Sequence, residues 1–247
     1  MNRLSVSLLQ FAPIWENRSA TKEKIAELTN SLAGTDWLVL PEMALTGFSM
    51  DRTKTTWDAC DYSFFSELAK NKKCAITVGA VEEGRNTALF YSSSGNIEAR
   101  YRKRHLFSYA EENKNYIPGT NDCFYKIGDW KIAQAICYDL RFPYQFWRAT
   151  AETDVYCLLA AWAGKRREHW KVLLKARAIE NQSYVIGVNR CGEEPSVSYT
   201  GDSMIIDPQG NEVLDCGASE GIFTAEIDYE TLRSWRSAFP VLRDRQE

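Results

Sequence analysis

The sequence has few of the residues that metal sites and disulfide frameworks require. Only two histidines occur, His105 and His169, and their unrelated contexts argue against a histidine-based metal site. The seven cysteines are an odd number and none are arranged as Cys-x-x-Cys, which excludes a zinc ribbon and a thioredoxin motif. Because 247 residues suffice for a sizeable core without covalent staples, reduced thiols are the simplest account. We therefore expect a cytoplasmic protein without a metal.

Long hydrophobic runs and an excess of one charge are also missing. The N-terminal MNRLSVSLLQF is interrupted by serine and glutamine and lacks the apolar region of a signal peptide. No stretch is long enough to span a bilayer. A net charge of −3 gives no electrostatic reason to expect nucleic acid or a membrane surface as a partner.

No low-complexity segment or linker divides the chain, so we expect one domain over residues 1–247. Alternation and apolar runs predict strands, and amphipathic spacing predicts helices. The order of the expected elements is strand 4–10, helix 19–33, strand 36–42, helix 60–72, strand 74–83, hairpin 87–101, strand 131–139, helix 142–152, strand 155–163, helix 166–181, strand 183–191, hairpin 204–215 and strand 221–228.

The same element order occurs in both halves of the chain: strand, helix, strand, helix, strand, hairpin. This repetition predicts a four-layer α-β-β-α sandwich, an α/β fold of two mixed sheets with helices outside. A single doubly wound sheet is the alternative, but it accommodates the hairpins poorly.

The stretch AQAICYDLRFP, residues 133–143, raises the first functional question. An apolar run stops at Cys137, and a free cysteine is more often an inert buried residue than a nucleophile. A nucleophilic Cys137 would need a base or a nearby cation, because a thiol at pH 7 is only a few per cent ionised. The stretch alone leaves both interpretations open.

Three further residues can supply that chemistry. Glu42 follows an apolar strand in LVLPEMALTGF, where an unpaired carboxylate would be costly to bury, and Phe48 nearby offers an apolar wall. In RYRKRHLF, alternation puts Lys103 on one face with Tyr101 and His105. Glu42 can accept a proton and Lys103 can stabilise negative charge on an oxyanion. A Cys–His pair of Cys137 and His105 is the alternative.

LPEMALTGF, YRKRHLF and AICYDLRFP, in this order, resemble the glutamate, lysine and cysteine motifs of the nitrilase superfamily of carbon–nitrogen hydrolases. The resemblance implies that Glu42 is the general base, Lys103 the transition-state stabiliser and Cys137 the nucleophile. Glu112 matches the second glutamate of the family, although Glu111 is adjacent. The resemblance also implies the α-β-β-α sandwich, a homodimer, and no cofactor.

The compact length and CYDLRFP resemble the omega-amidases, which hydrolyse the amide of α-ketoglutaramate and α-ketosuccinamate. Deaminated-glutathione amidases and N-carbamoyl amino acid hydrolases share the triad and remain alternatives, as does a catalytically silent binding protein on this fold. The backbone N–H of Tyr138 would help to hold the oxyanion. Arg141 would bind either the substrate carboxylate or an acidic neighbour such as Asp139. The segment AAWAG, residues 160–164, replaces a Pro-Gly-Ala-Phe-like sequence that many omega-amidase relatives have at this place. Trp162 is therefore expected to reshape the substrate pocket.

Overall fold

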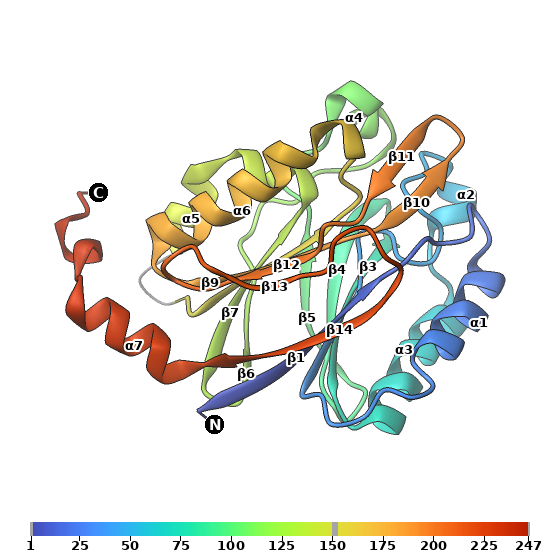
Figure 1. The fold of residues 1–247 in the computed structure, drawn as a ribbon. Helices are drawn as coiled ribbons and strands as arrows, with labels where there is room; N and C mark the ends of the chain where they lie inside the picture. The colour runs from blue at the N-terminus through green and yellow to red at the C-terminus, as the bar shows by residue number, and fades with distance from the viewer. Residues whose placement is uncertain (1, 150–152, 247) are drawn as a thin grey trace.

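A computed structural model describes residues 2–149 and 153–246. Two six-stranded sheets form the centre of the molecule (Figure 1). The first sheet has the order β14 (Gly221–Asp228), β1 (Arg3–Gln10), β2 (Trp37–Val39), β3 (Ala75–Glu82), β4 (Arg85–Tyr91) and β5 (Ile97–Arg102). The second has the order β13 (Glu212–Asp215), β12 (Met204–Ile206), β9 (Tyr184–Asn189), β8 (Val155–Ala160), β7 (Trp130–Ile136) and β6 (Phe124–Ile127).

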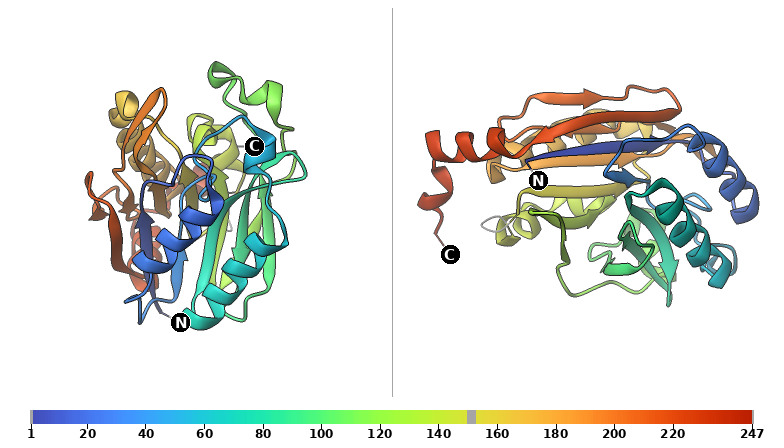
Figure 2. Two further views of the ribbon diagram at one scale, coloured as in Figure 1. Left: turned by 90° about the vertical axis from the view of Figure 1, so that its right-hand side faces the viewer. Right: turned by 90° about the horizontal axis from the view of Figure 1, so that it is seen from below.

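Helices cover the outer face of each sheet, as the two views in Figure 2 also show. The helices α1 (Arg18–Leu28) and α3 (Ala59–Lys72) lie on the first sheet, and α5 (Pro143–Ala149) and α6 (Arg167–Asn181) lie on the second. The predicted α-β-β-α sandwich is confirmed, and the single doubly wound sheet is wrong. No helix in the described part of the chain combines the length and hydrophobicity that crossing a bilayer requires.

Alternation along each strand separates the two cores. On β1 and β2, Val6, Leu8, Trp37 and Val39 point into the core between the sheets, whereas Leu38 joins the core beneath α1 and α3. This period of two was the signal that predicted the strand over 4–10, whereas a continuous apolar run predicted the strand over 36–42. β1, β2 and β3 run parallel, as do β7, β8 and β9, so their carboxyl ends meet at one edge of the sandwich.

Several predicted boundaries are too long. The helix expected over 19–33 ends at Leu28, and both the backbone N–H and the hydroxyl of Thr29 donate to the Ile25 carbonyl, at 2.9 and 2.7 Å. The strand expected over 131–139 ends at Ile136, where a 3₁₀ turn begins. The strands expected over 36–42, 155–163 and 183–191 are likewise shorter than predicted. Of the helix expected over 142–152, residues 150–152 lie outside the described residues.

Some elements were not predicted because they are short, polar or both. They are α2 (Arg52–Thr55), α4 (Glu112–Asn115), β6, the separate hairpin of β10 (Cys191–Glu194) and β11 (Val197–Thr200), and α7 (Tyr229–Ala238). The expected hairpins and the last strand are confirmed, and the last strand pairs antiparallel with β1, which ties the C-terminal part of the chain to the first sheet.

Candidate active site

The site forms where the carboxyl ends of the parallel strands meet. Glu42 follows β2, Cys137 follows β7 directly, and Ala161 follows β8. The loop that carries Glu42 lies against Gly79 of β3, whose N–H donates to the Pro41 carbonyl at 3.1 Å. A Cβ at Gly79 would come within 2.5 Å of the Glu42 Cα. Because Gly79 has no side chain, the loop that carries Glu42 can pack closely against β3 and reach the second sheet.

Cys137 occupies a strained backbone position at the start of a 3₁₀ turn that spans Cys137–Arg141. Its φ of 46° lies in the left-handed region, which is unusual for a residue with a side chain. Burial, and then the negative charge of Glu42, raise the pKa of the Cys137 thiol well above its ordinary value, while Lys103 and the Ala161 N–H act in the opposite direction. The resting cysteine is therefore a thiol.

Lys103 lies between two carboxylates, and all three side chains are buried. Its Nζ donates to Glu42 Oε1 at 2.7 Å and to Glu112 Oε2 at 2.9 Å. Burial alone would lower the pKa of Lys103, but Glu112 and Glu42 outweigh it and raise this pKa. The ammonium group is therefore charged and lies beside the thiol, where it can stabilise developing negative charge.

The choice between the adjacent glutamates follows from their surroundings. The Glu112 carboxylate is buried and also accepts the Phe107 N–H at 2.6 Å. Burial raises the pKa of Glu112, Lys103 lowers it, and Glu42 raises it further. Glu111, in contrast, is exposed and pairs with Lys114. The structure thus brings Glu112, and not Glu111, to the lysine.

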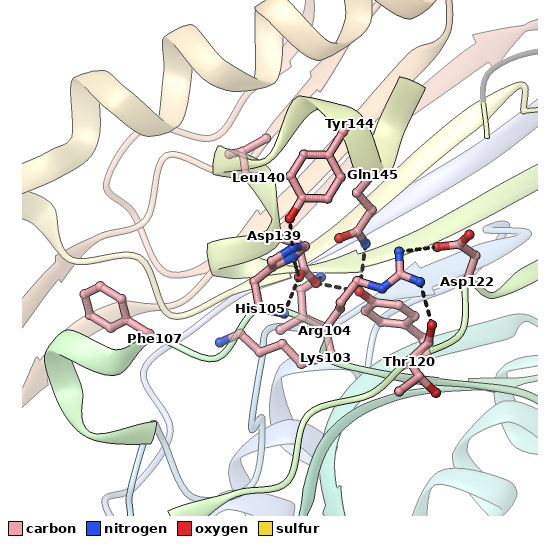
Figure 3. A network of polar contacts seen from close by, with 12 residues as sticks. Lys103, Arg104, His105, Phe107, Thr120, Asp122, Asp139, Leu140, Tyr144 and Gln145 are labelled. Carbon is pink, nitrogen blue, oxygen red and sulfur yellow. Dashed lines mark hydrogen bonds and ion pairs between the residues drawn. The ribbon is translucent and has the colours of Figure 1, made fainter. Parts of the chain in front are cut away.

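A second polar network ties the lysine segment to the cysteine turn, as Figure 3 shows. The buried Asp139 carboxylate accepts from Tyr101 Oη at 2.7 Å and from the His105 backbone N–H at 2.9 Å. Tyr101 and His105, two residues to either side of Lys103, thus meet at Asp139, whereas Lys103 Nζ binds Glu42 and Glu112. The amino group of Lys103 points away from this network.

His105 is fully engaged in the same network. Its Nδ1 lies 2.7 Å from Asp139 Oδ1 and its Nε2 2.5 Å from Tyr144 Oη, and its ring stacks on Phe142 at 3.9 Å. With both ring nitrogens bound elsewhere, His105 has no nitrogen facing Cys137. These contacts disfavour the alternative of a Cys–His pair.

A cavity of about 350 Å³ opens at Cys137. It includes the predicted substrate-binding residues Phe48, Tyr138, Arg141 and Trp162. The guanidinium of Arg141 lies 4.7 Å from the centre of the Trp162 ring, and one of its nitrogens is 3.2 Å from His169 Nδ1. Arg141 does not pair with Asp139, whose oxygens bind other donors.

Two further cations, Lys165 and Arg166, line the same cavity. Their sequence context, AGKRREH, is that of a solvated charge run, so they were not predicted. Arg166 lies over the Phe107 ring at 5.3 Å and Lys165 over the Tyr109 ring at 5.6 Å. Within the described residues, neither these two nor Arg141 has a carboxylate partner. Burial, and then Arg166, lower the pKa of Arg141.

Over residues 2–149 and 153–246 there is no group of His, Cys, Asp and Glu side chains suited to a metal ion. The charges at the site are instead those of Lys103, two carboxylates and the cavity cations. The cavity is therefore lined both by the Cys137 thiol and by three cations, Arg141, Lys165 and Arg166.

Comparisons with known proteins identify the family of the chain. The family model of carbon–nitrogen hydrolases matches residues 5–237. Omega-amidase YafV of Escherichia coli is 34% identical over 100% of this chain and 98% of its own length, and 2-oxoglutaramate amidase of Bacillus subtilis is 34% identical over 85% and 84%. XC1258 of Xanthomonas campestris, a CN-hydrolase superfamily protein crystallised with an arsenic adduct in its active site, superposes with a TM-score of 0.94 at 30% identity, covering 100% and 98% of the two chains. The chain therefore belongs to the carbon–nitrogen hydrolase family and is an amidohydrolase of the omega-amidase-like branch of the nitrilase superfamily.

Proposed function

We propose that the chain is an omega-amidase that hydrolyses the terminal amide of a small dicarboxylic acid monoamide, such as 2-oxoglutaramate (α-ketoglutaramate), and releases ammonia. The observation that carries this proposal is the cavity itself. Arg141, Lys165 and Arg166 line it together with Cys137, and none of the three pairs with a carboxylate among the described residues. A short substrate with an amide at one end and a carboxylate at the other complements this arrangement.

Acylation begins with proton transfer from the Cys137 thiol to Glu42. Within the described residues, Glu42 Oε2 accepts only the Ala161 N–H, at 2.8 Å, and keeps a lone pair for the thiol proton. The thiolate attacks the amide carbon, and the Lys103 ammonium and the Tyr138 backbone N–H hold the oxyanion. Glu42 then returns the proton to the amide nitrogen, the C–N bond breaks, and ammonia leaves a thioester on Cys137.

Deacylation uses the same groups in reverse. Glu42 takes a proton from water, the hydroxide attacks the thioester carbon, and the oxyanion again lies against Lys103. The C–S bond breaks, and the cysteine recovers its proton from Glu42. In this scheme Glu112 keeps Lys103 charged and in place.

The carboxylate end of the substrate determines where the amide end lies relative to Cys137. Arg141 offers a planar fork to the carboxylate, and the Trp162 ring holds that fork in place. Phe48 and Trp162 provide apolar walls for the methylene groups between the two polar ends. Binding at Arg141 would therefore fix how far the amide reaches toward Cys137.

The experiment is a panel that measures ammonia or amine release from 2-oxoglutaramate, deaminated glutathione, an N-carbamoyl amino acid, glutamine and a short uncharged amide. The proposal predicts the highest kcat/KM for 2-oxoglutaramate and loss of turnover in Cys137→Ala, with Cys60→Ala as the control at an exposed cysteine. Higher kcat/KM for deaminated glutathione or the N-carbamoyl compound would assign one of the alternatives. No turnover of any substrate would indicate a silent binding protein.

We also propose that the chain forms a homodimer. Val172 and Ile179 lie on one face of α6 and are 60% and 54% exposed, so a second copy packed on this face would bury two aliphatic side chains. Sedimentation equilibrium should give a dimer, and the double variant Val172→Glu, Ile179→Glu should give a monomer, whereas Val213→Glu on β13 should not. A monomeric wild type would refute the proposal.

Finally, we propose a cytoplasmic location. All seven cysteines are free thiols, which suits a reducing compartment. Cell fractionation followed by alkylation under non-reducing conditions tests it, and recovery outside the cytoplasm would contradict it.

A further inference from the structure

Asn86 on β4 contacts both carboxylates of the catalytic centre and the backbone of Lys103, although nothing in its sequence context singles it out. Its Nδ2 donates to Glu42 Oε1 at 2.7 Å and to Glu112 Oε1 at 2.8 Å. Its backbone carbonyl accepts the Lys103 N–H at 2.8 Å. The residue is completely buried and does not line the substrate cavity.

The two carboxylates that Asn86 joins are close enough to disturb each other. Both contact one ammonium group, so the cluster of Glu42, Lys103 and Glu112 carries a net charge of −1 when all three are ionised. Burial and the charge of Glu42 raise the pKa of Glu112, whereas Lys103, the Phe107 N–H and Asn86 lower it. The charge of each buried carboxylate therefore disfavours the charge of the other.

A side-chain amide is suited to this position because its –NH₂ group has two hydrogens and no charge. One hydrogen goes to each carboxylate, whereas a hydroxyl could serve only one of them. No described residue donates to Oδ1 of Asn86, so the two carboxylates alone fix which way the amide faces.

We propose that Asn86 is a positioning residue that keeps Glu42 and Glu112 ionised together, so that Glu42 remains a base and Lys103 remains available to the oxyanion. This inference rests on the roles proposed above for Glu42 and Lys103. It goes beyond them because it assigns the ionisation of the pair to a neutral residue that touches neither substrate nor thiol.

The test replaces Asn86 with aspartate, which has nearly the same shape but removes both donors and adds a third carboxylate. The acid limb of the pH profile of kcat/KM should move up by about one pH unit or more, because each carboxylate is then harder to ionise. At pH 7, kcat should fall by about tenfold or more, while KM changes less than about threefold because the cavity is intact. The matched control is Asn96→Asp in the exposed turn of the same hairpin, which should leave the profile unchanged.

Asn86→Ala covers the case in which the aspartate variant does not fold, since it removes both donors without adding charge. Its acid limb should move in the same direction by a smaller amount. The pH dependence of Cys137 alkylation by iodoacetamide provides a readout that needs no substrate, and it should also shift upward in both variants. Lower kcat with an unchanged pH profile and unchanged alkylation would make Asn86 merely structural and overturn the inference. A wild type without turnover would instead refute the proposed function, and the alkylation profiles would still test Asn86.

Discussion

Replacing Arg141 with lysine keeps a positive charge in the cavity but removes the planar fork of the guanidinium. In the structure this group stacks on Trp162 at 4.7 Å and lies 3.2 Å from His169 Nδ1. No described carboxylate pairs with it, so its remaining N–H groups can meet the carboxylate of a substrate. A bidentate contact there would consist of two charge-assisted hydrogen bonds.

The expected loss follows from counting those bonds. A hydrogen bond to a charged group contributes about 1.5–3 kcal/mol net, and lysine can keep one of the two. Losing the other should lower kcat/KM for 2-oxoglutaramate by about tenfold or more, which corresponds to about 1.4 kcal/mol. Part of the loss should appear in kcat, because the contact orients the amide toward Cys137.

Steady-state ammonia release from 2-oxoglutaramate and from a short uncharged amide gives the measurement. The uncharged amide should lose little in Arg141→Lys, since it has no carboxylate to hold. Arg148→Lys is the control, because Arg148 stacks on Tyr144 at 5.6 Å and does not line the cavity. Equal losses on both substrates would refute the reasoning and make Arg141 a support of the turn that carries Cys137.

Three further variants test the surroundings of the site. Glu112→Gln should lower kcat by about 100-fold or more, because it removes the charge of one buried partner of Lys103. Glu111→Gln, at an exposed residue, should keep kcat near that of the wild type. An unchanged kcat in Glu112→Gln would contradict the role assigned to Glu112. His105→Gln should lose only part of its kcat, about tenfold, since His105 positions the segment through Asp139; complete inactivation with an intact fold would restore histidine as the base. Gly79→Ala should lower kcat and should also lower the free energy of unfolding by about 1–3 kcal/mol, and with it Tm, because the new Cβ meets the Glu42 backbone. A melting curve like that of the wild type would show that the loop can move aside.

Much of the architecture followed from local signals in the sequence. Period-two alternation and continuous apolar runs indicated the strands, and the hairpins around Ser94-Gly95 and Pro208-Gln209-Gly210 were marked by their turn residues. Strand ends were harder to predict, because hydrogen bonds from distant parts of the chain decide them. The strand before Cys137, for example, ends where the buried Asp139 carboxylate accepts the Ile136 N–H at 3.0 Å.

The site was predictable where it coincided with a motif and not where it depended on long-range contacts. Glu42, Lys103 and Cys137 could be proposed from the sequence because each lies in a recognisable segment. Asn86 was missed because its partners Glu42 and Glu112 are 44 and 26 residues away, and an asparagine in a strand carries no local signal of them. Arg166 was missed because an arginine in a charged run is usually solvated.

Mass spectrometry of the protein quenched during turnover of 2-oxoglutaramate tests the central claim most directly. If Cys137 is the nucleophile, peptide mapping should find the acyl group on Cys137 and on none of the other six cysteines, and the adduct should disappear once the substrate is consumed. Turnover that persists in Cys137→Ala, or an acyl group on any other residue, would contradict the account.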